Sequence, residues 1–135
     1  MSDKVFVDSN VIIYAHTDFQ PSKQLAAQQI IIDKYTVVSS QVLNGTANIL
    51  RKKFKQNWSD IAVVVKEITE NNALYVNDDE TTLRACSVAD RYGFSFYDSL
   101  IVAAALISKC SVLYSEDLQD GQQIEYLTVA NPFHD

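Results

Sequence analysis

The sequence has few of the features that mark membrane or secreted proteins. Its longest apolar stretches lie at residues 30–32, 61–65 and 100–107, whereas a membrane-spanning helix needs about 20 apolar residues. The first four residues pass directly into a strand-like run, without a basic and then an apolar segment, so we expect no secretion signal. These absences predict a cytoplasmic protein that does not bind membranes.

Cysteine is also scarce, with two residues, Cys86 and Cys110, in a chain of 135. They form no CxxC pair and show no metal-ligand spacing. We therefore expect two buried, reduced thiols, as in a cytoplasmic protein. His16 and His134 are equally isolated, and neither has the spacing of a metal ligand.

Basic residues are fewer than acidic ones, with 11 Lys and Arg against 17 Asp and Glu, which gives a net charge of −6. A protein that binds nucleic acid by neutralising phosphates alone is more often basic. An acidic protein can still act on nucleic acid if its carboxylates bind a divalent metal ion, because the metal reverses the local charge.

The chain contains no repeat, low-complexity tract or Gly/Ser-rich linker, so we expect a single domain over residues 1–135. Strand-like and helical segments alternate, which predicts an α/β fold around a mostly parallel sheet of about five strands flanked by helices. The predicted strands lie at residues 4–7, 35–38, 73–76, 111–114 and 126–129. The predicted helices lie at residues 11–15, 21–34, 41–54, 61–69, 79–92 and 100–107.

Three aspartates fall close to the ends of predicted strands. Asp8 follows the first strand, Asp117 follows the fourth, and Asp98 opens the helix before the fourth strand. Ligand sites in such sheets collect at the carboxyl ends of the strands, so these acids could meet at one edge. Clustered carboxylates repel one another unless a cation or protons compensate. Mg²⁺ or Mn²⁺ is the natural partner, and it could activate water against a phosphodiester.

Each aspartate also has a purely structural interpretation. Asp8 could be only a helix cap, and the other two could be a cap and a solvated loop residue. Asn10 could orient an acid or a metal-bound water, or only make a local turn bond. Ser115 could orient Asp117 in the same way. Glu116 ranks below Asp117, because its side chain would point the opposite way if the strand continued.

Gly45 lies in the predicted helix at residues 41–54, where glycine costs roughly 1 kcal/mol relative to alanine. Asn44 and Gly45 together are also a hairpin turn signal. We favour the helix, because the surrounding apolar residues keep helical spacing. These residues are Val42, Leu43, Thr46, Ala47, Leu50 and Phe54.

Four segments together resemble PIN-domain proteins, and more narrowly the VapC-type toxin ribonucleases of VapBC toxin–antitoxin pairs. They are FVDSNVIIYA at residues 6–15, SSQVLNGTANIL at 39–50, FYDSLIVAAAL at 96–106 and LYSEDLQDGQ at 113–122. The resemblance implies a PIN fold and an Mg²⁺- or Mn²⁺-dependent endoribonuclease. It also implies a cognate antitoxin that holds the toxin inactive, and a homodimer.

The resemblance places three of the family's four catalytic, metal-binding acids on Asp8, Asp98 and Asp117. The second acid of the family, a glutamate, falls on Gly45. We therefore expect weakened metal binding and low activity in this chain, with the fold preserved. One base change converts a glutamate codon to a glycine codon. We favour an inactivating change over a natural pseudo-enzyme, because the other three acids persist.

A basic cluster follows Gly45 on the same predicted helix and consists of Arg51, Lys52, Lys53 and Lys55. It could guide an RNA backbone to the acids, or it could be only a solvated helix face. Apolar residues near residues 12–19 and 61–65 could take an antitoxin segment or a second protomer. Two alternatives to the ribonuclease function remain. One is a non-catalytic PIN-like binding module. The other is a phosphatase of the haloacid-dehalogenase type, although Asn10 stands where its second aspartate would be.

Overall fold

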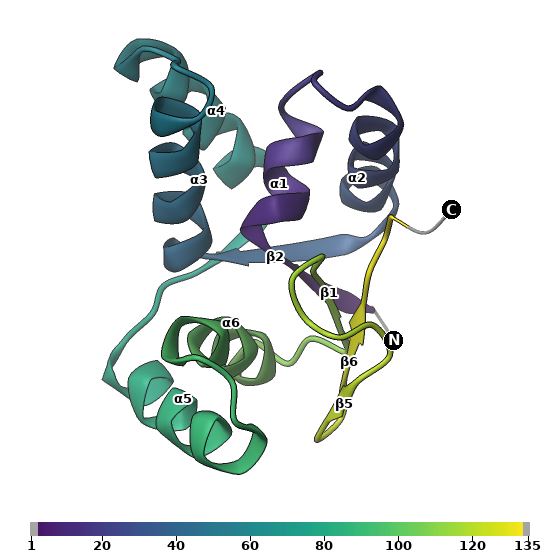
Figure 1. Ribbon diagram of the computed structural model, residues 1–135, viewed down its shortest axis with the longest axis vertical. Coiled ribbons are helices and arrows are strands. Elements are labelled where there is room, and N and C mark those ends of the chain that lie inside the picture. Colours follow the sequence, from purple (N-terminus) through teal and green to yellow (C-terminus); the bar gives the residue numbers. More distant parts are fainter. Residues whose placement is uncertain (1–2, 134–135) are drawn as a thin grey trace.

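The computed structural model describes residues 3–133, which form six helices and six strands (Figure 1). The strands are β1 (Lys4–Val7), β2 (Tyr35–Ser39), β3 (Ala73–Tyr75), β4 (Val112–Tyr114), β5 (Gln123–Ile124) and β6 (Leu127–Ala130). The helices are α1 (Ser9–Ala15), α2 (Pro21–Asp33), α3 (Ser40–Lys52), α4 (Trp58–Asn71), α5 (Asp79–Tyr92) and α6 (Phe96–Ile107).

The strands form one sheet in the order β3-β2-β1-β4-β6-β5, in which only the β5–β6 pair is antiparallel. The predicted α/β class and mostly parallel sheet are confirmed. The five predicted strands are the parallel ones, and β5 was missed because two residues carry no periodic pattern. The chain leaves β1 toward β2 and returns on its other side as β4, which makes the β1–β4 boundary a topological switch point.

Helices cover both faces of the sheet. In Figure 1, α1 to α4 lie above the sheet, and α5 and α6 lie below it. The central strand β1 is buried on both faces, with Phe6 and Val7 inaccessible to solvent. Eight consecutive residues of α6, Ser99 to Leu106, are buried, which explains why this helix is apolar on nearly every side. Packing on both faces therefore holds the carboxyl ends of β1 and β4 in place.

Several local expectations are settled by the helices. Gly45 lies within α3, so the hairpin interpretation is wrong. Gly93 ends α5 with φ 76°, the left-handed conformation that favours glycine. The start of α4 was placed too late, because its cap is Asn57. The start of α6 was also placed too late, because its cap is Ser95, so Asp98 is not a cap.

Two further expectations concern surface and core. Cys110 is buried as expected, but Cys86 is exposed on α5, so the prediction of two buried thiols is half wrong. No helix within residues 3–133 is long and apolar enough to cross a membrane. His134 lies outside the described residues.

Candidate functional site

Asp8 lies at the switch point, immediately after β1. Strand register pairs Val7 with Tyr114, and the Asp8 amide donates to the Tyr114 carbonyl at 3.0 Å. The Asp8 carboxylate caps α1 by accepting the Ser9 amide at 2.7 Å on Oδ1. Its Oδ2 accepts the Ser115 hydroxyl at 2.8 Å. Asp8 is therefore a helix cap, but the bond from Ser115 ties it to the other strand as well.

Ser115 organises the acids at the ends of β1 and β4. It is fully buried, and while it donates to Asp8 its hydroxyl oxygen accepts the backbone amide of Asp117 at 3.2 Å. The sequence predicted a contact with Asp117 alone. The structure adds the bond to Asp8. The Ser115 hydroxyl thus connects the buried Asp8 carboxylate to the loop that carries the exposed Asp117.

The electrostatics of Asp8 show which carboxylates share this region. Asp8 is only 6 % exposed, and this burial raises the pKa of its carboxyl group above the ordinary value. Hydrogen bonds from Ser115 and Ser9 lower the pKa, whereas the nearby charges of Asp117 and Asp98 raise it. The charges of Asp98 on α6 and of Asp117 in the loop after β4 therefore both act on the Asp8 carboxyl group.

The donor set matches the chemistry of a hard divalent cation. Carboxylate, hydroxyl and amide oxygens are the ligands that Mg²⁺ and Mn²⁺ prefer, and a cation would offset the cost of ionising Asp8 in its buried position. Among residues 3–133, however, no three His, Cys, Asp or Glu side chains are gathered as a ready ligand set. The oxygen ligands are therefore of the kind that Mg²⁺ and Mn²⁺ prefer, but the side chains do not form a complete ligand set.

Gly45 lies on the helix face that borders these acids. One turn before it, Gln41 donates to the carbonyl of Tyr97, the residue next to Asp98, at 3.2 Å. One turn after it, Ile49 lines the pocket described below. Residues four apart share a helix face, so a side chain at position 45 would point between α6 and the pocket. A Cβ atom there would meet nothing within 4 Å.

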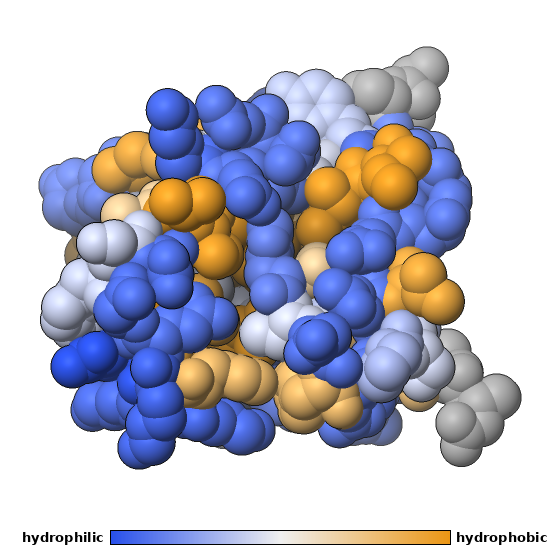
Figure 2. All heavy atoms as spheres, turned by 90° about the horizontal axis from the view of Figure 1, so that it is seen from above, coloured by the Kyte–Doolittle hydropathy of each residue, from blue (hydrophilic) through white to orange (hydrophobic). Residues whose placement is uncertain are grey.

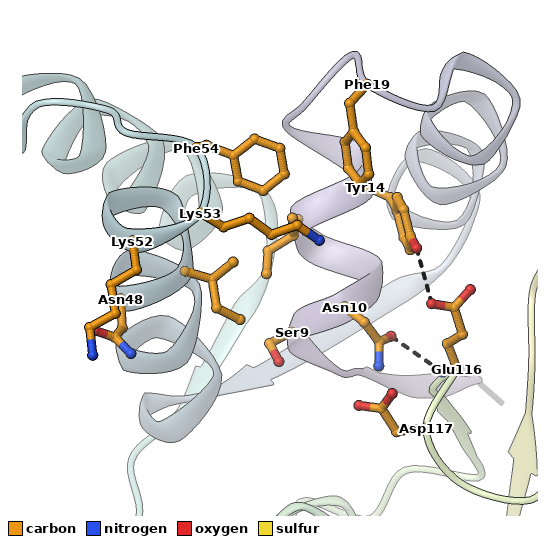
Figure 3. Close-up of a pocket in the computed structure, with 12 residues that line it drawn as sticks. Ser9, Asn10, Tyr14, Phe19, Asn48, Lys52, Lys53, Phe54, Glu116 and Asp117 are labelled. Carbon is orange, nitrogen blue, oxygen red and sulfur yellow. Dashed lines mark hydrogen bonds between the residues drawn. The ribbon is translucent and has the colours of Figure 1, made fainter.

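Asn10 and Glu116 face the same loop in different ways. The Asn10 Oδ1 atom accepts the Glu116 amide at 3.3 Å, and its buried Nδ2 atom has no partner within the described residues. Figure 3 shows this nitrogen turned toward Asp117. The Glu116 carboxylate turns away, accepting Tyr14 Oη at 3.1 Å and Lys23 Nζ. Asn10 is thus placed to donate to Asp117 or a ligand, whereas Glu116 is engaged elsewhere.

A pocket of about 330 Å³ opens beside Asp117, between α1 and the end of α3 (Figure 3). Of the basic cluster, Lys52 and Lys53 line it. Arg51 instead donates to the Gln56 carbonyl at 3.1 Å, and Lys55 is not among the lining residues. The pocket is lined by Ser9, Asn10, Ile13, Tyr14, Phe19, Asn48, Ile49, Lys52, Lys53, Phe54, Glu116 and Asp117.

The aromatic side of this pocket was not predicted. Tyr14 could have been found, because it lies four residues after Asn10 and so on the same face of α1. Phe19 follows the end of α1, where no periodic pattern places a side chain. Phe54 was predicted to lie in the helix at residues 41–54, but α3 ends at Lys52. Their approach depends on how α1 and α3 pack.

The sequence matches the PIN-domain family over residues 5–119, and the chain belongs to that family. No curated protein matches the sequence closely enough to count as a relative. Solved structures do share the fold. A toxin–antitoxin complex from Klebsiella pneumoniae is 16% identical, with a TM-score of 0.71, over 97% of this chain and 99% of that chain.

Two further solved structures are VapC-type toxins. DNA-bound VapBC from Salmonella typhimurium is 15% identical, with a TM-score of 0.70, over 97% of this chain and 99% of that chain. VapC20 of Mycobacterium tuberculosis, described as a sarcin–ricin loop cleaving toxin, is 18% identical, with a TM-score of 0.66, over 84% of this chain and 89% of that chain. These neighbours confirm the PIN fold that the four sequence segments predicted.

Proposed function

We propose that this chain is the toxin of a toxin–antitoxin pair, a metal-dependent endoribonuclease weakened by glycine at position 45. The observation that carries the proposal is the place of Asp8 at the switch point of a PIN fold, where the charges of Asp98 and Asp117 act on its carboxyl group. Phosphodiester hydrolysis by a divalent cation requires such carboxylates. VapC20, the structural neighbour described as a sarcin–ricin loop cleaving toxin, supports RNA as the substrate class.

In this proposal, Asp8, Asp98 and Asp117 hold Mg²⁺ or Mn²⁺, which when bound supplies water activation and stabilises charge on the phosphoryl group. Ser115 fixes the Asp8 carboxylate and the Asp117 backbone relative to each other. Asn10 offers its unpartnered amide nitrogen to Asp117 or to an RNA oxygen.

The cations on the pocket rim would attract the RNA backbone. Lys52 and Lys53 line the pocket that contains Asp117, and they are local positive charges on a chain of net charge −6. Arg51 and Lys55 would contribute less, because neither lines the pocket.

Gly45 lowers the predicted activity by leaving the ion one carboxylate short. The space around position 45 is open to a Cβ atom, so a side chain can begin there without a clash. The fold does not depend on an acid there, because α3 is helical with glycine. Metal affinity and turnover would therefore be lost while stability is kept.

A cognate antitoxin and a second copy of the chain are the proposed protein partners. Structural neighbours crystallised as toxin–antitoxin assemblies support the antitoxin as a partner. Figure 2, which looks onto the side of α1 to α4, shows separate hydrophobic areas among hydrophilic side chains. The large exposed hydrophobic residues of α2 and α4 are Leu25, Ile32, Trp58 and Val63.

The second candidate is a non-catalytic PIN-like binding module. Gly45 favours it, because selection for cleavage would retain the glutamate. The haloacid-dehalogenase alternative gains no support, since the family match is to the PIN domain. Asn10, which stands where that phosphatase needs an aspartate, accepts a backbone amide instead.

Cleavage of a mixed RNA pool in Mg²⁺ or Mn²⁺ tests the proposal. We would compare this chain with Gly45→Glu, with Gly45→Gln as a control of equal size, and with Gly45→Glu combined with Asp98→Asn. Cleavage by Gly45→Glu alone is the expected result. If all four proteins are folded and inert, the binding-module function replaces the enzyme.

A further inference from the structure

The pocket wall farthest from Asp117 is built of aromatic rings. Tyr14 and Phe19 are stacked, with centroids 5.4 Å apart and an interplanar angle of 16°. Phe54 meets Phe19 edge-on, with centroids 5.1 Å apart. Figure 3 shows Phe19 and Phe54 at one end of the pocket and Asp117 at the other. This wall plays no part in the carboxylate chemistry proposed above.

The wall is held in place from behind. The Tyr14 hydroxyl donates to Glu116 at 3.1 Å, and the Lys23 ammonium lies 4.6 Å from the Tyr14 ring centroid. Lys23 also donates to Glu116. Tyr14 is thus fixed against Phe19, while Phe19 itself remains 43% exposed. A planar ligand group would find a ring that needs little ordering.

Positive charge lies directly beside the wall. The Lys53 ammonium is 5.4 Å from the Phe19 centroid and 5.8 Å from the Phe54 centroid. Lys52 lines the same pocket. Aromatic rings interleaved with cations bind single-stranded nucleic acid by stacking its bases and neutralising its phosphates. An aliphatic ligand would use neither the ring faces nor the charge.

We propose that Phe19 and Phe54 form a nucleobase subsite that stacks one unpaired base of an RNA strand, with Lys52 and Lys53 contacting its phosphates. The identity of the nucleic acid rests on the proposed ribonuclease function. The pocket of about 330 Å³ is within the range of small-ligand sites and continues to Asn10 and Asp117. A base held on the wall orients the adjoining backbone toward the carboxylates.

The subsite selects RNA by strand state. A base inside a duplex is already stacked on its neighbours and cannot lie on Phe19, whereas a base in a loop or single strand can. The subsite would therefore strengthen the binding of a single-stranded oligonucleotide but not that of a duplex.

The test is fluorescence anisotropy with labelled RNA, performed on the chain with Gly45, where binding is read without cleavage. Three probes are used: a mixed-sequence single strand, a duplex of equal length, and an abasic strand that keeps the phosphates. The variants are Phe19→Ala, Phe19→Leu and Lys53→Ala. Trp58→Ala is the matched control, because Trp58 is 60% exposed with Arg51 over its ring, yet does not line the pocket.

We expect Phe19→Ala and Phe19→Leu to weaken single-strand binding at least about fivefold and to leave abasic-strand binding unchanged. Lys53→Ala should weaken both, and Trp58→Ala neither. Phe19→Leu keeps apolar packing, so it separates loss of stacking from loss of fold.

The subsite is overturned if the Phe19 variants bind every probe like the parent, in which case the wall serves a protein partner or packing alone. It is also overturned if Trp58→Ala has an equal effect. The outcome is independent of catalysis: cleavage by Gly45→Glu with no effect of Phe19 removes the subsite and keeps the ribonuclease. If the Phe19 variants lose single-strand binding but Gly45→Glu does not cleave RNA, the subsite is kept and the ribonuclease function is removed.

Discussion

The Ser115 hydroxyl lies 2.8 Å from Asp8 Oδ2 and joins the carboxyl ends of β1 and β4 by donating to this buried carboxylate. The two strands pair in parallel, so the bond crosses the point where the chain changes direction around the sheet. The same oxygen accepts the Asp117 amide. The relative position of two proposed metal ligands therefore depends on a single side chain.

Ser115→Ala should lower the free energy of unfolding by about 1–3 kcal/mol, because it leaves Asp8 Oδ2 buried without its donor. Urea denaturation at neutral pH measures the loss. Ser111→Ala is the matched control, since Ser111 lies exposed before the other end of β4 and should change stability by less than about 0.5 kcal/mol. Equal losses in the two variants would show that the Asp8 bond contributes nothing of its own.

Asp8→Asn should stabilise the folded chain, and more so as pH rises. Burial raises the pKa of Asp8, so the folded state binds this proton more tightly than the unfolded state. Stability is therefore lost as pH rises from the unfolded value through the raised pKa, and the loss is complete above it. The Asp8→Asn variant should be more stable than the parent at pH 8, and this difference in stability should shrink toward pH 4.

Thermal denaturation across this pH range measures the gap. Asp18→Asn, which makes the same charge change on an exposed residue between α1 and α2, is the control. A variant at Asp8 that is less stable than the parent at every pH would mean that the hydrogen bonds to the carboxylate outweigh its desolvation.

Much of the fold could be predicted from local pattern. The runs before Asp8 and after Lys34 are rich in β-branched residues and end at polar residues, which is enough to place β1 and β2. The caps could not be predicted in the same way, because several residues that can cap a helix lie within four positions at the start of α4 and of α6. Strand β5 could not be predicted, because its pairing with β6, and not a pattern in its own sequence, makes it a strand.

The site divides in the same way. The rule that ligand sites lie at the carboxyl ends of parallel strands was enough to place Asp8 and Asp117 at the same edge of the sheet. The rule does not say that Ser115 bonds to Asp8, or that Glu116 turns toward Lys23. Those interactions depend on the packing of segments about a hundred residues apart in sequence, as does the approach of Phe19 to Phe54 on the packing of α1 against α3.

Gly45→Ala should raise the free energy of unfolding by about 1 kcal/mol, because α3 is helical at this position and the new Cβ meets nothing within 4 Å. Gly45→Glu should gain less, since its charge adds to that of the nearby aspartates. Mg²⁺ should raise the melting temperature of the glutamate variant more than that of the alanine variant. Equal shifts on adding Mg²⁺ would place the side chain at 45 outside the metal site.

The basic cluster should divide into cations that bind RNA and cations that do not. Lys52→Ala and Lys53→Ala should each reduce the dependence of single-strand affinity on salt, by about 0.7 in the slope of log K against log salt for each phosphate that is no longer neutralised. Lys55→Ala should not, because Lys55 does not line the pocket. Lys66→Ala, an exposed cation on α4, controls for the loss of one positive charge. A salt slope that falls equally in all four variants would mean that RNA senses only net charge, and the path from Lys53 to Asp117 would then have no role in binding.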